Sequence, residues 1–321
     1  MLKKFISILF LTILVVSFIG CCTKEPNEPK KGSIQPSANK SEKADKDSTN
    51  NTSPYKDLDL RLGRIPYTNS SQMLVQHQAF MKYLAEKIGV KSVRLQTAPD
   101  YSSILKKLVA GDIDIAWLAS LSAVEARNNP EVELLCKPVR YGTTSYRGIV
   151  LARQDSGIRT LRDLKNKKFA WVDKESASAY LFPKAMMLEA NIDPDRDFAE
   201  VDTLGKHDAV VYNVLLGKYD AGACYDDARN TLRDKSKKDE LIILATTQDI
   251  SNEPLVCRKS LPQDLRDRIK AVLLELNNKT PEGREILKDL ADVQGFVKVD
   301  ARDYDSIEKV LKALDKYKNK N

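Results

Sequence analysis

The chain has 321 residues, of which 42% are hydrophobic and 30% are charged, a balance that is ordinary for a globular protein long enough to form two domains. Its formal net charge is +7, and the basic excess is spread thinly along the chain. We therefore expect no nucleic-acid-binding surface, because such surfaces concentrate Lys and Arg on one face.

The first 20 residues predict a signal peptide. The basic start "MLKK" precedes the apolar run "FISILFLTILVVSFIG", which is too short to span a membrane comfortably. Residues 18–21, "FIGC", resemble the bacterial lipobox, although Phe18 stands where that motif usually has Leu. The resemblance implies cleavage before Cys21 and lipid attachment to its thiol, which would hold the protein at a membrane. The alternative is an uncleaved anchor helix.

Residues 21–56 predict the lipidated cysteine followed by a disordered tether. From residue 23 onward this stretch has almost no large apolar side chains and is rich in Lys, Ser, Asn and Pro, so it cannot bury a core. The three later cysteines all lie in apolar runs, and we expect them to be small core residues, with at most one disulfide between them. They are Cys136, Cys224 and Cys257.

From Asp57 onward, short apolar runs alternate with helical periods, which predicts an α/β fold with parallel sheets. The predicted strands are 58–65, 93–98, 113–119, 132–140, 146–153, 168–172, 198–204, 219–225 and 241–247, with a further apolar run at 254–260. The predicted helices are 72–87, 104–111, 123–128, 178–190, 208–216, 227–233, 262–277, 281–290 and 303–316.

The alternation breaks once, at the predicted strands 132–140 and 146–153, which follow each other with no helix between them. We therefore expect two lobes, each a mostly parallel sheet flanked by helices. The chain would cross between them at 141–148 and return at 247–254. Lobe 1 would comprise 57–145 and 254–321, and lobe 2 would comprise 146–253.

Polar turns follow the predicted strands throughout. Ligands of open parallel sheets bind beyond the carboxyl ends of the strands, and helix N-termini there present free N–H groups to anions. Each Ser or Asp taken singly is explained by N-capping, but the collective pattern indicates an anion site between two lobes. The turns are 68–71, 100–103, 120–122, 176–178, 206–208 and 225–227.

Three stretches resemble the periplasmic phosphonate-binding proteins of ABC importers. They run from "APDYSSILKKL" at 98 to Ala126, from "YRGIVLAR" at 146 to Phe198, and from "GKHDAVVYN" at 205 to Asn230, and the resemblance extends over 57–290. It implies the two-lobed periplasmic-binding-protein fold, with a ligand cleft between the lobes. It also implies capture of a phosphonate, phosphite or phosphate by lobe closure and delivery to a permease.

The same resemblance implies an oxyanion site. The family binds the phosphonate oxygens at an "S-T-S-G" turn, which reads Ser-Ala-Ser-Ala here, so Ser176 and Ser178 remain and the threonine hydroxyl is lost. His207 matches the family's His and is expected to donate a hydrogen bond to the same anion. The other histidine, His77, lies inside a predicted amphipathic helix and is expected to be structural.

The remaining site residues would surround the substituent on phosphorus. Tyr101 of "APDY" is expected to lie against the ligand, and Ser120 to act from the first lobe. Asp227 and Glu253 match carboxylates that surround an ammonium group in the family, although Asp227 could equally cap its helix. Leu118 replaces a second Tyr, so the substituent stays open, and a small alkylphosphonate, phosphite or phosphate would fit.

The resemblance also implies an ABC permease and its ATPase subunit as partners. ATP would be hydrolysed by that separate subunit, because no G-x-x-x-x-G-K-[ST] phosphate loop occurs in the chain. We expect a monomer in the cell envelope, lipid-anchored to the outer face of the cytoplasmic membrane or in the periplasm, with no cofactor, metal or nucleic acid. Three alternatives stay open: a binder of a thiamine precursor or another organic anion, a ligand sensor for a membrane receptor, and an enzyme. The enzyme is disfavoured, because no metal-ligand spacing and no G-x-S-x-G motif is found.

Overall fold

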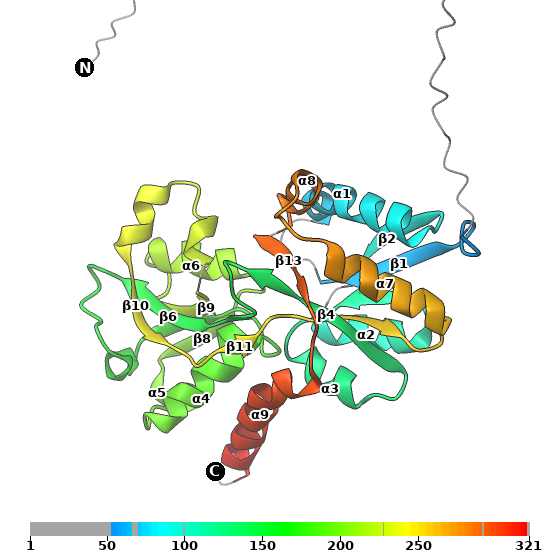
Figure 1. The fold of residues 1–321 in the computed structure, drawn as a ribbon. Helices are drawn as coiled ribbons and strands as arrows, with labels where there is room; N and C mark the ends of the chain where they lie inside the picture. Colours follow the sequence, from blue (N-terminus) through cyan, green and yellow to red (C-terminus); the bar gives the residue numbers. More distant parts are fainter. Residues whose placement is uncertain (1–52, 66–69, 99, 227, 291, 320–321) are drawn as a thin grey trace, which may run out of the picture. The chain divides into compact units, whose positions relative to one another are not determined.

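The computed structural model describes residues 53–65, 70–98, 100–226, 228–290 and 292–319 (Figure 1). The predicted signal peptide, the lipidated Cys21 and the tether up to residue 52 lie outside the described residues. The described part starts with a turn, in which the Tyr55 hydroxyl donates to both carboxylate oxygens of Asp264, at 2.7 and 2.8 Å. The predicted tether therefore extends too far, because packed structure is present from Ser53 and not only from Asp57.

The first sheet has six strands in the order β13-β4-β12-β3-β1-β2. β1 pairs in parallel with β2 and β3, whereas β12 is antiparallel to β3 and β4, and β13 is antiparallel to β4. The sheet is thus mixed and not mostly parallel, because β12 and β13 return to it from the second half of the chain. The bounds are β1 Asp59–Arg64, β2 Ser92–Thr97, β3 Ile115–Trp117, β4 Val132–Arg140, β12 Leu255–Arg258 and β13 Val293–Val297.

Helices cover both faces of this sheet. Side chains alternate along β3, so Ile115 and Trp117 pack with one core cluster and Ala116 with another. The first face carries α1 (Ser70–Ile88), α7 (Gln263–Glu275) and α8 (Pro281–Leu287), which lie together in Figure 1, and the second carries α2 (Tyr101–Ala110) and α3 (Ser122–Asn128).

The second sheet has five strands in the order β10-β6-β9-β7-β8 and is also mixed, with β6 antiparallel to both its neighbours. Ile149 and Leu151 of β6 pack on the face covered by α6, and Val150 and Ala152 on the opposite face. The strands are β6 Gly148–Arg153, β7 Lys168–Trp171, β8 Glu200–Thr203, β9 Ala221–Tyr225 and β10 Leu241–Thr246. The helices are η1 Leu161–Leu164, η2 Ala177–Leu181, α4 Phe182–Glu189, α5 Pro194–Asp197, α6 His207–Leu215, η3 Ala228–Thr231 and η4 Lys235–Glu240.

Two short strands join the sheets. β5 (Ser145–Tyr146) and β11 (Ile250–Ser251) pair antiparallel where the chain passes between the two sheets. A buried lysine supports them: Lys137 Nζ contacts Ser251 Oγ at 3.2 Å and Asp303 at 2.9 Å. The Tyr304 hydroxyl donates to the Asn252 carbonyl at 3.1 Å. The two crossings are therefore tied to each other and to the C-terminal segment.

The C-terminal segment comprises η5 (Ala301–Tyr304) and α9 (Asp305–Lys318). α9 packs against α4 of the second sheet and against α3 of the first, with Ile307 and Val310 in one cluster with Phe182. Sequence patterns missed β13, an edge strand with Gly295 in its middle, and they predicted a helix at 227–233 where the described residues form only the 3-10 turn η3. Short elements of this kind are set by tertiary packing more than by periodicity.

Candidate functional site

Four chain segments meet at one edge of the first sheet. β4 runs in the same direction as β1 and β3, because β12 is antiparallel to both β3 and β4. The carboxyl ends of these three strands therefore lie at one edge and carry Arg64, Trp117 and Arg140. Glu253 lies at the same edge, two residues before β12. This is the edge where open α/β sheets bind ligands.

Arg64 is a buried cation, 6% exposed. Its guanidinium carbon lies 3.7 Å from the centre of the Trp117 ring, a cation–π contact, and its Nη1 donates to His77 Nε2 at 2.7 Å. His77 Nδ1 in turn donates to the Met73 carbonyl at 2.8 Å. Burial, and next the charge of Arg64, lower the pKa of His77 to about 3, so this histidine is neutral. His77 is structural, as predicted.

Arg140 forms an ion pair with Glu253. Burial by itself would raise the pKa of Glu253, but the charge and hydrogen bond of Arg140 outweigh it and hold the pKa below its usual range. Arg140 also lies 5.8 Å from the centre of the Trp117 ring. Glu253 was predicted to face a ligand ammonium, and the structure instead gives it a guanidinium partner.

The second set of donors lies after β7. Ser176 is the N-cap residue of η2, and its hydroxyl oxygen accepts from the Ala179 N–H at 3.1 Å. η2 is a single π turn, closed by the Leu181 N–H on the Ser176 carbonyl at 3.0 Å, and it continues into α4. The Ser178 hydroxyl has no hydrogen-bond partner among the described residues, although the side chain is buried. Both serine hydroxyls therefore retain a proton that they can donate.

Gly148 makes this turn possible. A Cβ added to Gly148 would lie 2.2 Å from the carbonyl oxygen of Ser178, a distance that no side chain tolerates. The turn at residues 176–179 is called the serine turn below. The first residue of β6 must be glycine for this turn to pack on it.

His207 is the first residue of α6 and half-buried. Its Nδ1 accepts from the Tyr225 N–H at 3.2 Å, and the two rings are in contact, 4.7 Å between centres. Burial lowers the pKa of His207 to about 4, with Glu253 acting in the opposite direction. With Nδ1 accepting, the proton of the neutral ring is on Nε2, which is a hydrogen-bond donor.

The other predicted residues lie as follows. Ser120 is buried in the connection between the sheets, where its hydroxyl donates to the Ser251 carbonyl at 2.8 Å and contacts the Tyr146 hydroxyl at 3.2 Å. Leu118 is 2% exposed within a core cluster of the first sheet. Tyr101 is the first residue of α2, and Asp227 lies outside the described residues. The structure thus directs Ser120 and Leu118 into packing.

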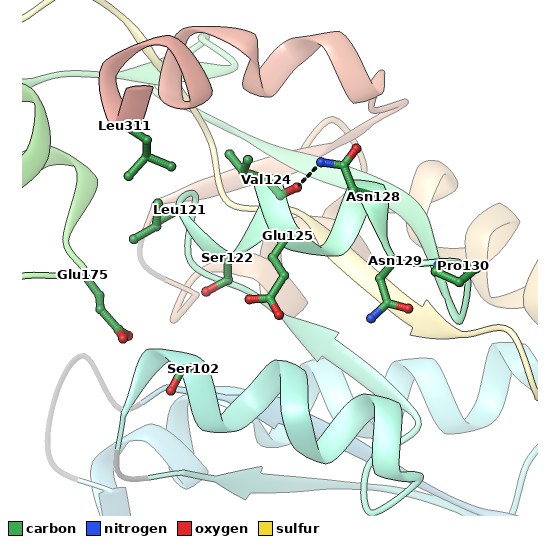
Figure 2. A pocket seen from close by; sticks show the side chains of 10 residues that line it. All are labelled: Ser102, Leu121, Ser122, Val124, Glu125, Asn128, Asn129, Pro130, Glu175 and Leu311. Atoms are coloured by element: carbon green, nitrogen blue, oxygen red, sulfur yellow. Dashed lines mark hydrogen bonds between the residues drawn. The ribbon is translucent and has the colours of Figure 1, made fainter. Parts of the chain in front are cut away.

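A pocket of about 620 Å³ lies beside the serine turn (Figure 2). Glu175, which directly precedes Ser176, faces Ser102 at the start of α2 and Glu125 of α3 across it. Burial raises the pKa of Glu175, helped by Asp173 and Asp100, while the Ser102 N–H acts against this shift. Among the described residues, two acidic and no basic side chains line this pocket, which disfavours an oxyanion in it.

The arrangement suits binding of an anion. The second sheet has neutral donors at two helix starts and the first sheet has guanidinium groups at one edge, both in partly buried settings where such donors are effective. Within the described residues no group of three or more His, Cys, Asp or Glu could hold a metal ion. The three described cysteines are free and buried, and burial raises the pKa of their thiols, as expected for core residues.

Comparison with known proteins decides the family. Residues 62–304 match the model of the phosphonate ABC transporter periplasmic substrate-binding proteins. The chain belongs to this family. The match begins within β1 and extends through the remaining strands of both sheets. Together with the structural similarity given below, it confirms the two-lobed periplasmic-binding-protein fold that the sequence predicted.

Relatives of this binding protein differ in their named ligands. It is 27% identical over 238 residues to a phosphonates-binding periplasmic protein of Escherichia coli, covering 72% of this chain and 70% of that one. It is 26% identical over 229 residues to a phosphate-import protein of Mycolicibacterium smegmatis, covering 67% and 71%. The structure of the PhnD1 protein of Prochlorococcus marinus with methylphosphonate has a TM-score of 0.71 and 23% identity, covering 80% of this chain and 98% of that one.

The sequence patterns did not indicate that Arg64 and Arg140 lie at one edge of the first sheet. Arg64 and Arg140 lie at the ends of predicted strands, where each looks like a solvated strand terminus. The available signal was that both end strands whose carboxyl ends share an edge, the same rule that selected the serine turns.

Proposed function

We propose that this protein captures a phosphorus oxyanion, such as a phosphonate, phosphite or phosphate, and delivers it to an ABC permease. One observation carries the proposal: residues 62–304, which include the serine turn and His207, match the family model of the phosphonate substrate-binding proteins. We infer that the neutral donors of the second sheet and the arginines at the edge of the first sheet border one site, as binding of a tetrahedral anion requires.

In the proposed site, the hydroxyls of Ser176 and Ser178 and Nε2–H of His207 donate to the anion oxygens. Arg64 and Arg140 would supply positive potential from the edge of the first sheet. Tyr101 and Asp227 would complete the site next to the substituent. Donors that are fixed in place by packing cost little reorganisation when the ligand binds.

Capture proceeds by closure of two lobes in this proposal, 57–145 with 254–321 and 146–253. The paired strands β5 and β11 are the connection about which the lobes would move. A ligand that contacts both lobes stabilises the closed state by its differential affinity for it. The tie of Tyr304 to Asn252 places the C-terminal segment where it would move with this connection.

We further propose that the protein works as a monomer without catalysis, anchored by a lipid on Cys21 at the outer face of the cytoplasmic membrane or in the periplasm, with the permease and its ATPase subunit as partners. The apolar run before Cys21 supports the anchor. No helix in the described ranges is both long and apolar enough to cross a membrane.

Calorimetric titration of the full chain in detergent micelles tests the function. The panel is phosphate, phosphite, methylphosphonate, 2-aminoethylphosphonate and sulfate. We expect tight binding of at least one phosphorus compound and about tenfold weaker binding by Ser176→Ala, which loses one donor. A folded protein that gives no heat with any phosphorus compound would contradict the proposal and favour another organic anion, such as a thiamine precursor.

A further inference from the structure

The C-terminal helix α9 packs against elements of both sheets. It contacts α3 on the first sheet, and η2 and α4 on the second, and Figure 1 shows it beside α3 and α4. One buried apolar cluster joins these elements. It includes Ala123 of α3, Ala177 and Leu181 of η2, and Ile307, Val310 and Leu314 of α9. The helix is therefore part of the packing behind the serine turn.

Ala177 is the point at which this cluster reaches the serine turn. It stands between the two serines, and it is 5% exposed. The π turn η2 is closed by the Ala179 N–H on the Ser176 hydroxyl and by the Leu181 N–H on the Ser176 carbonyl. One turn of helix has little stability of its own, so the packing behind it decides how firmly it is held.

Arg127 of α3 ties the start of α9 to the first sheet. Its side chain is 8% exposed, and its Nη1 donates to the Ala301 carbonyl and to the Asp305 carboxylate, each at 2.6 Å. Its Nη2 donates to the Glu308 carboxylate. A planar guanidinium that contacts two carboxylates and a carbonyl fixes their relative positions as a lysine ammonium cannot. Charged contacts thus hold α9 to α3, and apolar contacts hold it to η2.

We propose that α9 positions the serine turn for anion binding, and that Arg127 is the residue through which the first sheet sets this position. Arg127 is a positioning residue in this role and contacts no ligand. When the tie is loosened, α9 supports Ala177 less firmly and the serine hydroxyls sample more orientations. Ordering them again when the anion binds costs affinity. The inference rests on the proposed function, since it concerns how the donors of the same site are held.

Hydrogen exchange of the full chain in detergent micelles, without ligand, tests the coupling between Arg127 and the turn. Exchange of an amide reports local opening of the structure around it. We expect Arg127→Gln to accelerate exchange at residues 177–181 by about threefold or more, although the substituted side chain lies in another element. Arg127→Lys keeps the charge but cannot contact all three partners at once, so its exchange rates should fall between those of Arg127→Gln and wild type.

Calorimetry of the same proteins tests the effect on binding. The ligand is whichever of phosphate, phosphite, methylphosphonate and 2-aminoethylphosphonate the wild type binds most tightly. We expect Arg127→Gln to bind it about fivefold more weakly, and Arg127→Lys to restore part of the affinity. The carboxylates that lose their partner, Asp305 and Glu308, are 49% and 32% exposed, so water can solvate them and the variant should fold.

Two variants of α9 keep the test independent of the folding of Arg127→Gln. Glu308→Gln removes the pairs with Arg127 and with Lys312, whereas Lys312→Gln removes only the second, an exposed pair within α9. We expect Glu308→Gln to change exchange and affinity in the same direction as Arg127→Gln. Lys312→Gln is the matched control and should equal wild type in both measurements. Thermal unfolding of each variant reports whether it is folded.

Three results would overturn the inference. The first is unchanged exchange at 177–181 in folded Arg127→Gln and Glu308→Gln. The second is faster exchange with unchanged affinity, because Arg127 would then stabilise the turn without positioning its donors. The third is an equal effect of Lys312→Gln, which would make net charge and not the tie to α3 the cause. A wild type that binds no phosphorus compound would instead refute the proposed function and with it the role in anion binding, while exchange still decides whether α9 supports the turn.

Discussion

The edge of the first sheet and the helix starts of the second sheet would contribute different kinds of chemistry to the proposed site. The first contributes charge through Arg64 and Arg140, which lie against Trp117. The second contributes neutral donors, the hydroxyls of Ser176 and Ser178. The groups that would attract an anion over a distance lie on the first sheet, and the donors that would fix its orientation lie on the second. An anion can satisfy both only when it contacts both, which is what a ligand-closed binding protein requires.

The two histidines differ in how many of their ring nitrogens are hydrogen-bonded within the protein. His77 uses both ring nitrogens inside the protein, on Arg64 and on the Met73 carbonyl, whereas the His207 ring uses Nδ1 and retains Nε2 as a donor. Both are neutral, but only one has a proton to offer a ligand. We therefore expect His77 to act in stability and His207 in the proposed binding, and the following experiments test that expectation.

The largest expected effect concerns His77 and pH. Its pKa in the folded protein is about 3, against an ordinary value of 6.5, so the unfolded chain binds more protons than the folded chain between these pH values. Stability therefore falls as pH falls, by roughly 3 kcal/mol between pH 6.5 and pH 4 from this residue alone. Urea unfolding of wild type and His77→Gln over this range measures it. Carboxylates contribute to both proteins, so a pH profile with the same slope in the variant would contradict the assignment.

The next prediction concerns the packing of the serine turn against Gly148. Gly148→Ala places a methyl group against the Ser178 carbonyl, which we expect to cost about 2 kcal/mol of stability and to weaken anion binding. Gly111→Ala is the control: its φ of +81° costs about 1 kcal/mol, but a Cβ there meets nothing within 4 Å. Denaturant unfolding and calorimetry measure both variants. Equal losses of binding in the two would show that the turn has no special part in the site.

A smaller effect is expected from His207→Ala, which removes the Nε2 donor. We expect about tenfold weaker binding of the preferred anion, the worth of one hydrogen bond to a charged group. Tyr212→Phe, a change in the same helix away from the site, should bind like wild type. NMR titration adds a second readout, because a bound anion should raise the pKa of His207 above about 4. An unshifted pKa in the complex would remove His207 from the site.

The smallest expected effect concerns Glu175, which lines the pocket of Figure 2. Glu175→Gln removes a negative charge beside the serine turn, and we expect about threefold tighter anion binding at low ionic strength that disappears at high salt. Glu189→Gln, an exposed change at the end of α4, controls for net charge. If both variants tighten binding equally, the field of the whole protein and not the position of Glu175 accounts for the effect.

Much of the fold could be predicted because its signals are local. The alternation of apolar runs and helical periods depends on neighbouring residues, and so does the capping role of Ser176. The motif around Ser178 and the motif around His207 each span only a few residues. These predictions required no knowledge of which strands pair.

The other features of the fold depend on which strands pair. The places of β12 and β13 in the first sheet, and the pairing of β5 with β11, join segments that lie far apart in the chain, so no local pattern specifies them. The same pairing brings Arg140 to Glu253 across 113 positions of sequence and converts an expected ammonium partner into half of an ion pair. By itself, the sequence determined the family and the two-lobed α/β fold, and it predicted the neutral donors of the proposed site. The tertiary structure decided the charge at the sheet edge, because charge there is the sum over groups that only folding brings together.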